Sequence, residues 1–205
     1  MDLVGYDRFG AYKVYECLGA GGMAAVHRAT IDIGGGVIRE VALKRLLPQL
    51  ADDKKLVDDF IRILELGRNG GTYFMAMELV HGSSLLQLMK LQHEQRLQAP
   101  IGVVVAILAE LLDALDYASN ATDADGEPLE IVHRDLTPSN LIVMPDGHLK
   151  IIDFGVARAV SGKFMTNTGM VKGKLGYMSE EVLEGRPLDR RADIFSIGVV
   201  AWELL

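Results

Sequence analysis

The sequence contains a single cysteine, Cys17, so no intramolecular disulfide can form. A cysteine-poor chain suits a reducing compartment, and we expect a cytoplasmic protein. The first ten residues have no basic start followed by an apolar run, so we expect no signal peptide. No stretch reaches about 18 uninterrupted apolar residues, the length that a membrane-spanning helix needs, so we expect no membrane span.

Basic residues are also scarce. Lysine and arginine number 21 against 28 aspartates and glutamates, which gives a formal net charge of −7. Nucleic-acid-binding proteins usually show a basic excess, so we expect no nucleic-acid partner. Hydrophobic residues are abundant, at 49% of 205 residues. This composition predicts a folded chain, long enough for one large domain or two small lobes.

Alternating apolar residues separated by glycines predict strands at the start of the chain. Residues 12–18, 23–31 and 37–46 alternate, and glycine-rich turns lie between them at 19–22 and 34–36. Three such segments joined by short turns predict an antiparallel meander.

The next segment has two interpretations. Residues 52–60 have aspartates suited to a helix N-terminus and predict a short helix. Residues 61–66 either extend that helix or form a strand. We favour the strand, because the Asn-Gly pair in 67–71 separates it from the apolar run 72–80, and this pair is a strong hairpin signal.

The second half of the chain is mainly helical by pattern. Residues 84–94 predict one helix and residues 100–119 a longer one that begins near a proline. We expect the buried stripe of the longer helix to consist of apolar residues at helical spacing: Ile101, Val104, Val105, Leu108, Leu112 and Leu115. Residues 193–205 predict a helix that is apolar on nearly all sides.

Two segments of the first half carry candidate chemistry. The glycine-rich turn near Gly19 and Gly21 lets backbone N–H groups approach phosphates, although a plain hairpin is the alternative. Lys44 lies in an apolar strand, where a cation needs an anionic partner such as phosphate. The alternative is a lysine at a strand end that points to water.

The stretch HRDLTPSN, residues 133–140, carries the third signal. Asp135 is suited to accept a proton from a hydroxyl, and Asn140 offers an amide oxygen to a divalent cation. Two short predicted strands, 141–144 and 148–153, would bring Asp153 of the sequence DFG back beside Asn140. Two oxygen ligands that face one space predict Mg²⁺ bound together with phosphates.

In this order and spacing, the four segments resemble the protein kinase signature set. The segments LGAGGMAAVHRA and HRDLTPSN look most like bacterial Ser/Thr kinases of the eukaryotic type. The resemblance covers the chain from about Tyr12 to Leu205. It implies an α+β, two-lobed protein kinase-like fold, with a small antiparallel β-sheet lobe at 1–80, a partial helical lobe at 81–205, and one kinase domain at 12–205.

The resemblance also implies ATP and Mg²⁺ as cofactors and a Ser or Thr hydroxyl of a protein as the acceptor. Asp135 would be the catalytic base, and Asn140 and Asp153 the Mg²⁺ ligands. Arg134 would contact a phosphorylated activation loop, and Asp193 would brace the catalytic loop. The implied nucleotide-binding residues are Leu18, Gly19, Ala20, Gly21, Gly22, Val26, Ala42, Lys44, Met77, Glu78, Val80 and Ile142.

The sequence departs from the family pattern beside the catalytic aspartate. Thr137 stands where Ser/Thr kinases usually carry a lysine, and Lys174 stands where they usually carry a threonine. We hypothesise an exchange of roles, in which Lys174 reaches the γ-phosphate and Thr137 supplies the hydroxyl. The alternative is two unrelated substitutions with Lys174 in solvent. A milder departure is Ala24 in place of the third glycine of the loop, which we expect to be tolerated if its φ is negative.

Two further departures concern the scaffold. Only 34 residues separate Lys44 from Glu78, and the predicted helix 52–60 has no glutamate to pair with the lysine, as kinases require. Asp58 or Asp59 could substitute, and Glu65 could do so only if 61–66 is helical. In Ser179-Glu180-Glu181, Glu180 replaces the usual proline. We therefore expect a truncated kinase domain that lacks its C-terminal helices.

Three outcomes remain open at this point. The chain is an active kinase, a non-catalytic nucleotide-binding or scaffolding pseudokinase, or an unstable product. Its last helix would expose an apolar patch through which the chain could self-associate. Thr166 and Thr168 are candidate phosphosites or simply exposed loop threonines.

Overall fold

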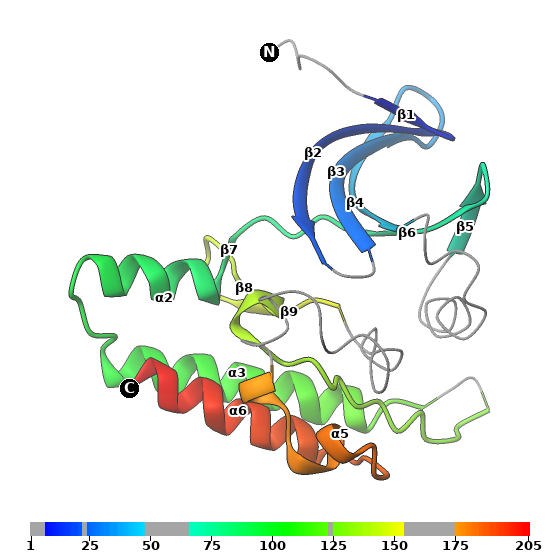
Figure 1. Ribbon diagram of the computed structural model, residues 1–205. Helices are drawn as coiled ribbons and strands as arrows, with labels where there is room; N and C mark the ends of the chain where they lie inside the picture. Colours follow the sequence, from blue (N-terminus) through cyan, green and yellow to red (C-terminus); the bar gives the residue numbers. More distant parts are fainter. Residues whose placement is uncertain (1–6, 22–23, 48–65, 123–124, 154–174) are drawn as a thin grey trace. The chain divides into compact units, whose positions relative to one another are not determined.

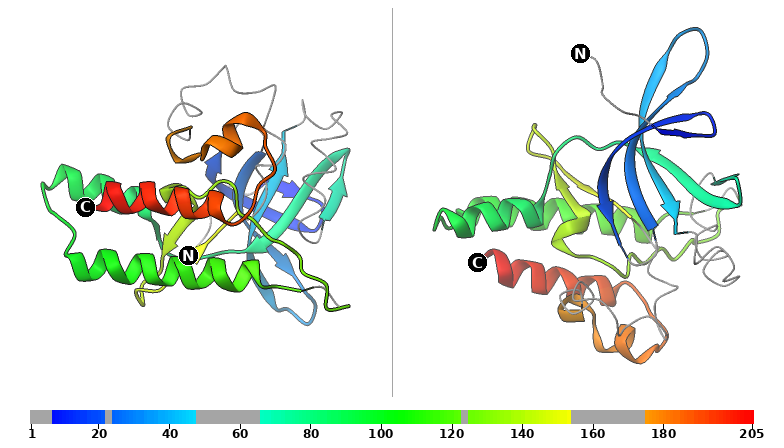
Figure 2. Two further views of the ribbon diagram at one scale, coloured as in Figure 1. Left: turned by 90° about the horizontal axis from the view of Figure 1, so that it is seen from below. Right: turned by 45° about the horizontal axis from the view of Figure 1, so that its top comes forward.

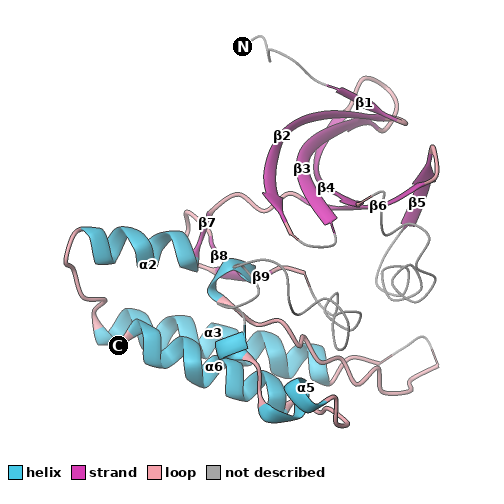
Figure 3. Cartoon of the chain, in the orientation of Figure 1, coloured by secondary structure: helices cyan, strands magenta, loops and turns pink. Residues whose placement is uncertain are grey.

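The chain divides into two compact units in the computed structural model (Figure 1), unit 1 at Met1–Val80 and unit 2 at His81–Leu205. Among the described residues, unit 1 consists of strands and unit 2 is mainly helical (Figure 3). The residues that the structure describes are 7–21, 24–47, 66–122, 125–153 and 175–205.

The described strands of unit 1 form one antiparallel sheet with the order β1-β2-β3-β4-β6-β5. The neighbours β2, β3 and β4 confirm the predicted meander. β2 continues further than expected, because Gly19 still pairs with Val26 of β3. The strands are β1 (Asp7–Phe9), β2 (Tyr12–Ala20), β3 (Ala24–Asp32), β4 (Ile38–Leu46), β5 (Leu66–Asn69) and β6 (Thr72–Glu78).

The hairpin of β5 and β6 confirms the strand interpretation over the helical one where the structure describes it, from residue 66 on. Its turn is shifted from the predicted position. Asn69 pairs with Thr72, so the strand runs through Asn69 and the two-residue loop is Gly70-Gly71. Both loop glycines have positive φ, +54° and +84°, the conformation that a tight hairpin loop of this twist requires.

The sheet of unit 1 curls so that its two edges approach each other, as the two views of Figure 2 show. A Cβ atom on Gly10, beside β1, would lie 3.5 Å from the side chain of Asn69 at the end of β5. The curled sheet encloses an apolar cluster. Phe9 and Tyr12 pack edge-on against Phe74, with ring centroids 5.3 and 5.5 Å apart. The buried members are Val14, Ala29, Val41 and Leu43.

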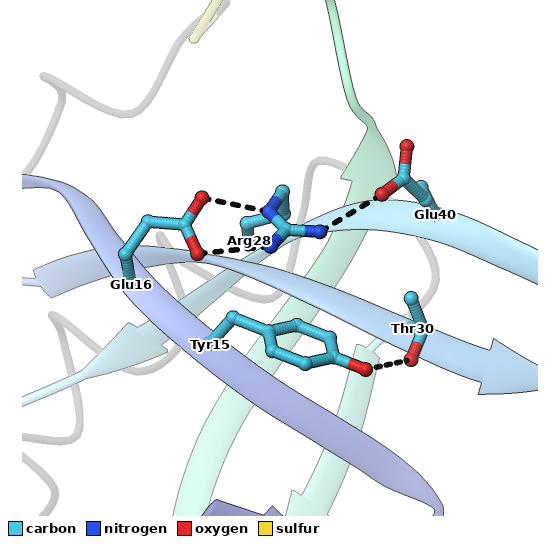
Figure 4. A network of polar contacts seen from close by, with 5 residues as sticks. All are labelled: Tyr15, Glu16, Arg28, Thr30 and Glu40. Atoms are coloured by element: carbon cyan, nitrogen blue, oxygen red, sulfur yellow. Dashed lines mark hydrogen bonds and ion pairs between the residues drawn. The ribbon is translucent and has the colours of Figure 1, made fainter. Parts of the chain in front are cut away.

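A polar network joins β2, β3 and β4 on the opposite face of the sheet (Figure 4). The guanidinium of Arg28 donates to Glu16 at 2.7 Å and to Glu40 at 2.9 Å, and lies 4.5 Å from the centroid of the Tyr15 ring. The Tyr15 hydroxyl in turn hydrogen-bonds that of Thr30 at 3.2 Å. These contacts fix the three strands to one another beyond their backbone ladder.

Unit 2 contains the helices predicted at 84–94, 100–119 and 193–205, whereas the helix predicted at 52–60 lies outside the described residues. Ser84 begins α2 with a capping box. The Ser84 hydroxyl accepts a hydrogen bond from the backbone N–H of Gln87, and the Gln87 side chain accepts one from the backbone N–H of Ser84. Figures 1 and 2 show α3 and α6 running side by side. The helices are α2 (Leu85–Glu94), α3 (Ile101–Ser119), α5 (Glu180–Glu184) and α6 (Arg191–Leu204).

The predicted buried stripe of α3 is partly wrong. Val104 and Leu115 are buried as expected, but Leu111 is the fully buried residue at the centre of the helix. Three residues of the predicted stripe are instead exposed: Ile101, Val105 and Leu112. The helix is apolar on more than one face, so its periodicity alone does not decide which face meets α6.

A small antiparallel sheet, β7-β8-β9, lies in unit 2 and confirms the predicted strand pair. Its members are β7 (Ser83–Ser84), β8 (Leu141–Val143) and β9 (Leu149–Ile151), and the 3₁₀ turn η2 (Pro138–Asn140) leads directly into β8.

α6 buries one face and exposes the other. Ile197, Val200 and Leu204 join the core of unit 2, whereas Phe195 is half exposed and Trp202 is 78% exposed. The expected exposed apolar patch is therefore present on this helix. None of the helices in the described ranges combines the length and the apolar character needed to cross a membrane.

Candidate active site

The loop between α3 and β8 brings Asp135 and Asn140 together. The side-chain amide of Asn140 donates to the backbone carbonyl of Asp135 at 2.7 Å and to its carboxylate at 3.1 Å. Asn140 is only 7% exposed and lies in η2, so its position is well constrained. Because both contacts use the amide nitrogen, the amide oxygen of Asn140 is turned away from Asp135.

Asp193 fixes the start of the same loop from the first turn of α6. One carboxylate oxygen accepts the backbone N–H of His133 at 2.7 Å, and the other accepts that of Arg134 at 2.9 Å. Asp193 is 3% exposed, so these two bonds satisfy a buried charge. The bracing geometry expected for this residue is therefore present.

His133 ties the loop to the strand pair. Its Nδ1 accepts the backbone N–H of Asp135 at 3.3 Å, and its Nε2 lies 3.0 Å from the carbonyl oxygen of Ile152. Since an amide N–H can only donate, the ring carries its proton on Nε2. Burial lowers the pKa of His133 from its ordinary value of 6.5, so the ring is neutral at neutral pH.

The β8–β9 pair returns the chain to Asn140. The backbone N–H of Ile152 donates to the carbonyl of Asn140 at 2.9 Å, so the next residue, Asp153, follows immediately beside it. Asp153 has a φ of +63°, and Arg134 has a φ of +68°. Such left-handed conformations are costly outside glycine and often mark functional sites.

These residues fit a magnesium site of two protein ligands. Within the described ranges, no cluster of three or more His, Cys, Asp or Glu side chains could hold a metal by itself. Mg²⁺ commonly takes only one or two protein oxygens and completes its shell with phosphate and water. The amide oxygen of Asn140 and the carboxylate of Asp153, the residue after Ile152, match that pattern in ligand type.

Thr137, the residue in the usual lysine position, is buried, with 3% exposure. Its hydroxyl lies 2.8 Å from that of Ser139. The two hydroxyls form a neutral pair two residues beyond Asp135, and the sequence alone did not suggest Ser139.

The predicted nucleotide residues of unit 1 lie mainly on four strands, β2, β3, β4 and β6. Lys44 lies two residues before the end of β4 and is only 6% exposed, and this burial excludes the alternative of a lysine that points to water. Its cross-strand partners are Val26 on β3 and Met75 on β6. Ala42, two residues earlier on the same face, is 8% exposed and pairs with Met77.

The glycine-rich turn follows β2. Leu18, Gly19 and Ala20 end that strand, and Gly21 donates its N–H to the carbonyl of Ala24 at 2.9 Å. A Cβ atom at Gly19 would meet no described atom within 4 Å, so packing does not require glycine there. Ala24 has no positive φ, which satisfies the condition for its replacing the third glycine.

The remaining predicted residues divide into two groups. Glu78 ends β6, Val80 follows it, and Ile142 lies on β8 of unit 2. Several others lie outside the described residues: Gly22, Asp58, Asp59, Glu65, Thr166, Thr168 and Lys174.

Two carboxylates of unit 2 with long-range contacts escaped the sequence analysis. Glu203 of α6 accepts a hydrogen bond from the hydroxyl of Tyr177, and burial together with this contact raises the pKa of Tyr177. Glu110 of α3 accepts from the backbone of β9. Neither residue belongs to a local motif, so no sequence signal pointed to it.

Known proteins resemble this chain over nearly its whole length. Residues 12–205 match the family described as "Protein kinase domain". The tyrosine-protein kinase MasK of Myxococcus xanthus is 36% identical over 96% of this chain and 33% of its own length. The serine/threonine-protein kinase PknL of Mycobacterium tuberculosis is 31% identical over 95% of this chain and 49% of its own. The chain thus spans about a third to a half of these relatives.

Solved structures give the same result for the fold. The PknI kinase domain of Mycobacterium tuberculosis, in its C20A variant, matches with a TM-score of 0.71 and 27% sequence identity. The match covers 100% of this chain and 77% of that domain. The predicted protein kinase fold is therefore confirmed.

Proposed function

The chain belongs to the protein kinase family, and on that basis we propose that it transfers the γ-phosphoryl group of ATP to a hydroxyl of a protein. The observation that carries the proposal is the arrangement of Asp135, Asn140 and Asp153 around one loop and one strand pair. A base and two oxygen ligands held together in this way are what phosphoryl transfer requires.

Each residue has a chemical task in the proposal. Asp135 accepts the proton of the attacking hydroxyl, and its hydrogen bond from Asn140 orients the carboxylate. Asn140 and Asp153 would hold Mg²⁺, which would neutralise part of the charge on the phosphates. Asp193 and His133 act indirectly, because they keep the loop in the conformation that Asp135 needs.

Unit 1 supplies the residues that hold the nucleotide in this proposal. Lys44, buried on β4, would pair with the α- and β-phosphates, which offer the opposite charge to its ammonium group. Ala42 and Val26 pack against adenine, and the backbone near Glu78 and Val80 hydrogen-bonds it. No described neighbour would obstruct a side chain at Gly19, so packing does not account for the glycine. Close approach of a phosphate to the backbone would account for it.

We favour serine and threonine as acceptors, since several similar bacterial proteins besides PknL carry the name serine/threonine-protein kinase. A tyrosine acceptor is the second candidate. It is favoured by the name of MasK and by Thr137, whose neutral hydroxyl pair with Ser139 replaces the lysine typical of Ser/Thr kinases. Phosphoamino-acid analysis of a labelled product separates the two.

Autophosphorylation with labelled ATP and Mg²⁺ tests the proposal. The wild-type chain should incorporate label, Asp135→Asn should not, and Asp113→Asn, an exposed aspartate on α3, should match wild type. Melting curves for all three chains come first, so that a folded protein is compared in each case. Label in both wild type and Asp135→Asn, or in neither, would instead favour a non-catalytic nucleotide-binding or scaffolding role.

A further inference from the structure

β9 has one paired edge and one edge without a strand partner in the described part of unit 2. β8 lies on the paired side. On the other side, the backbone N–H of Leu149 donates to Oε2 of Glu110 on α3, at 2.7 Å. The carboxylate therefore takes the position that a further strand would fill, and it satisfies a backbone donor at the sheet edge.

The other oxygen of Glu110 lies 3.0 Å from Nδ1 of His148, the residue before β9. The hydrogen bond from the Leu149 backbone is the main reason why the pKa of Glu110 lies below its ordinary value of 4.5. Glu110 is therefore ionised at neutral pH, and the Leu149 bond is strengthened by its charge. The His148 ring is 67% exposed, so the Leu149 contact is the better shielded of the two.

The opposite end of β9 is held by the catalytic loop. Ile152 donates its N–H to the carbonyl of Asn140, and its own carbonyl lies 3.0 Å from Nε2 of His133. Only the three residues Leu149–Ile151 separate this attachment from Glu110. Asp153 follows Ile152 directly, so both attachments constrain the backbone from which its carboxylate extends.

We propose that Glu110 is a positioning residue for the magnesium ligand Asp153 and acts on it through β9. The inference rests on the proposed function, because it takes Asn140 and Asp153 as the metal ligands. Glu110→Ala leaves the Leu149 N–H without its acceptor and releases the first residue of β9. Glu110→Gln keeps an oxygen that can accept the same hydrogen bond, so it should retain the effect.

Metal affinity measures this role without requiring catalysis. Mn²⁺, a paramagnetic substitute for Mg²⁺, is titrated into the chain in the presence of a non-hydrolysable ATP analogue, and free Mn²⁺ is followed by electron paramagnetic resonance. Glu110→Ala should raise the Kd for Mn²⁺ by about three- to tenfold. This is at or below the smallest losses of metal affinity usual for residues that hold a metal ligand in place. Glu110→Gln and the matched control Asp116→Ala, an exposed change on the same helix, should stay within about twofold of wild type.

Amide hydrogen exchange distinguishes positioning from general destabilisation. In Glu110→Ala the Leu149 amide should exchange faster, while the amides of α6 exchange as in wild type. Unchanged Mn²⁺ affinity in Glu110→Ala, an equal loss in Glu110→Gln, or faster exchange throughout unit 2 would each overturn the inference. A folded wild-type chain that binds no Mn²⁺ with the analogue would instead overturn the proposed function, and the inference with it.

Discussion

Asp193 accepts the backbone N–H of His133 at 2.7 Å, although 60 residues separate them in the sequence. This bond and its companion to Arg134 connect α6 to the catalytic loop. The stability of unit 2 and the conformation of its catalytic loop therefore both depend on one buried carboxylate.

Replacing Asp193 with asparagine should therefore destabilise the folded chain. The amide keeps one acceptor oxygen and presents an NH₂ group to the second backbone N–H, so one buried donor loses its partner. We expect the free energy of unfolding to fall by about 2–3 kcal/mol, measured by urea denaturation. The exposed Asp113→Asn serves as control and should change it by less than about 0.5 kcal/mol. Equal effects of the two changes would contradict the bracing role.

His133 predicts a pH dependence of stability. Its pKa is lower in the folded chain than the ordinary 6.5, so the unfolded chain takes up a proton that the folded chain does not. The neutral ring contributes fully to the free energy of unfolding above pH 6.5. This contribution is lost as the pH falls from 6.5 toward the pKa of His133 in the folded chain. Urea denaturation at pH 7.5 and 5.5 should show a larger loss for wild type than for His133→Gln, which cannot titrate. An identical loss in both would rule out His133 as the cause.

The hydroxyl of Tyr177 should stabilise the junction of η4 (Leu175–Tyr177) with α6. It donates to the Glu203 carboxylate, while Ser196 donates its hydroxyl to the Tyr177 carbonyl at 2.7 Å. Tyr177→Phe removes only the first contact and should cost about 1.5 kcal/mol, as for a hydrogen bond to a charged group. Tyr117→Phe, at a side chain 82% exposed, provides the comparison and should have no measurable effect.

Gly82 should not tolerate a side chain. A Cβ atom there would lie 2.4 Å from the carbonyl oxygen of Val143 on β8, so the β7–β8 pair would have to move. We expect Gly82→Ala to destabilise unit 2 by at least about 2 kcal/mol in thermal or urea unfolding. Gly102→Ala, within α3 and with open space around it, should instead be neutral or stabilising by up to about 1 kcal/mol. A tolerated Gly82→Ala would show that β7 is not held against β8.

The exchange hypothesis for Thr137 and Lys174 remains a prediction, because Lys174 lies outside the described residues. If the Lys174 ammonium reaches the γ-phosphate, Lys174→Ala should lower kcat by about a hundredfold, since charge stabilisation in the transition state is lost. ATP binding, measured by a thermal shift, should persist. An unchanged kcat would reject the exchange.

The sequence predicted the features that depend on local chemistry. The glycine turn predicted at 34–36 is present with positive φ, and the helix predicted at 84–94 is present as α2. The catalytic loop was also predictable, because Asp135 and Asn140 lie five residues apart and their contact is nearly local.

Features that depend on distant neighbours were not predictable. α3 has apolar residues on several faces, and its partners decide that Leu111 rather than Leu112 is buried. Glu110 resembles any surface glutamate, and its partner Leu149 lies 39 residues later. In the same way, nothing in the sequence around Glu203 indicates a contact with Tyr177, 26 residues earlier.

Trp202 is exposed on α6, so its fluorescence reports on the surroundings of this helix. It is the only tryptophan of the sequence, so indole fluorescence arises from one known position on the exposed face of one helix. In the isolated chain the emission should be red-shifted and readily quenched by iodide. Any molecule that covers this face, including a second copy of the chain, should shift the emission to the blue and shield it from the quencher.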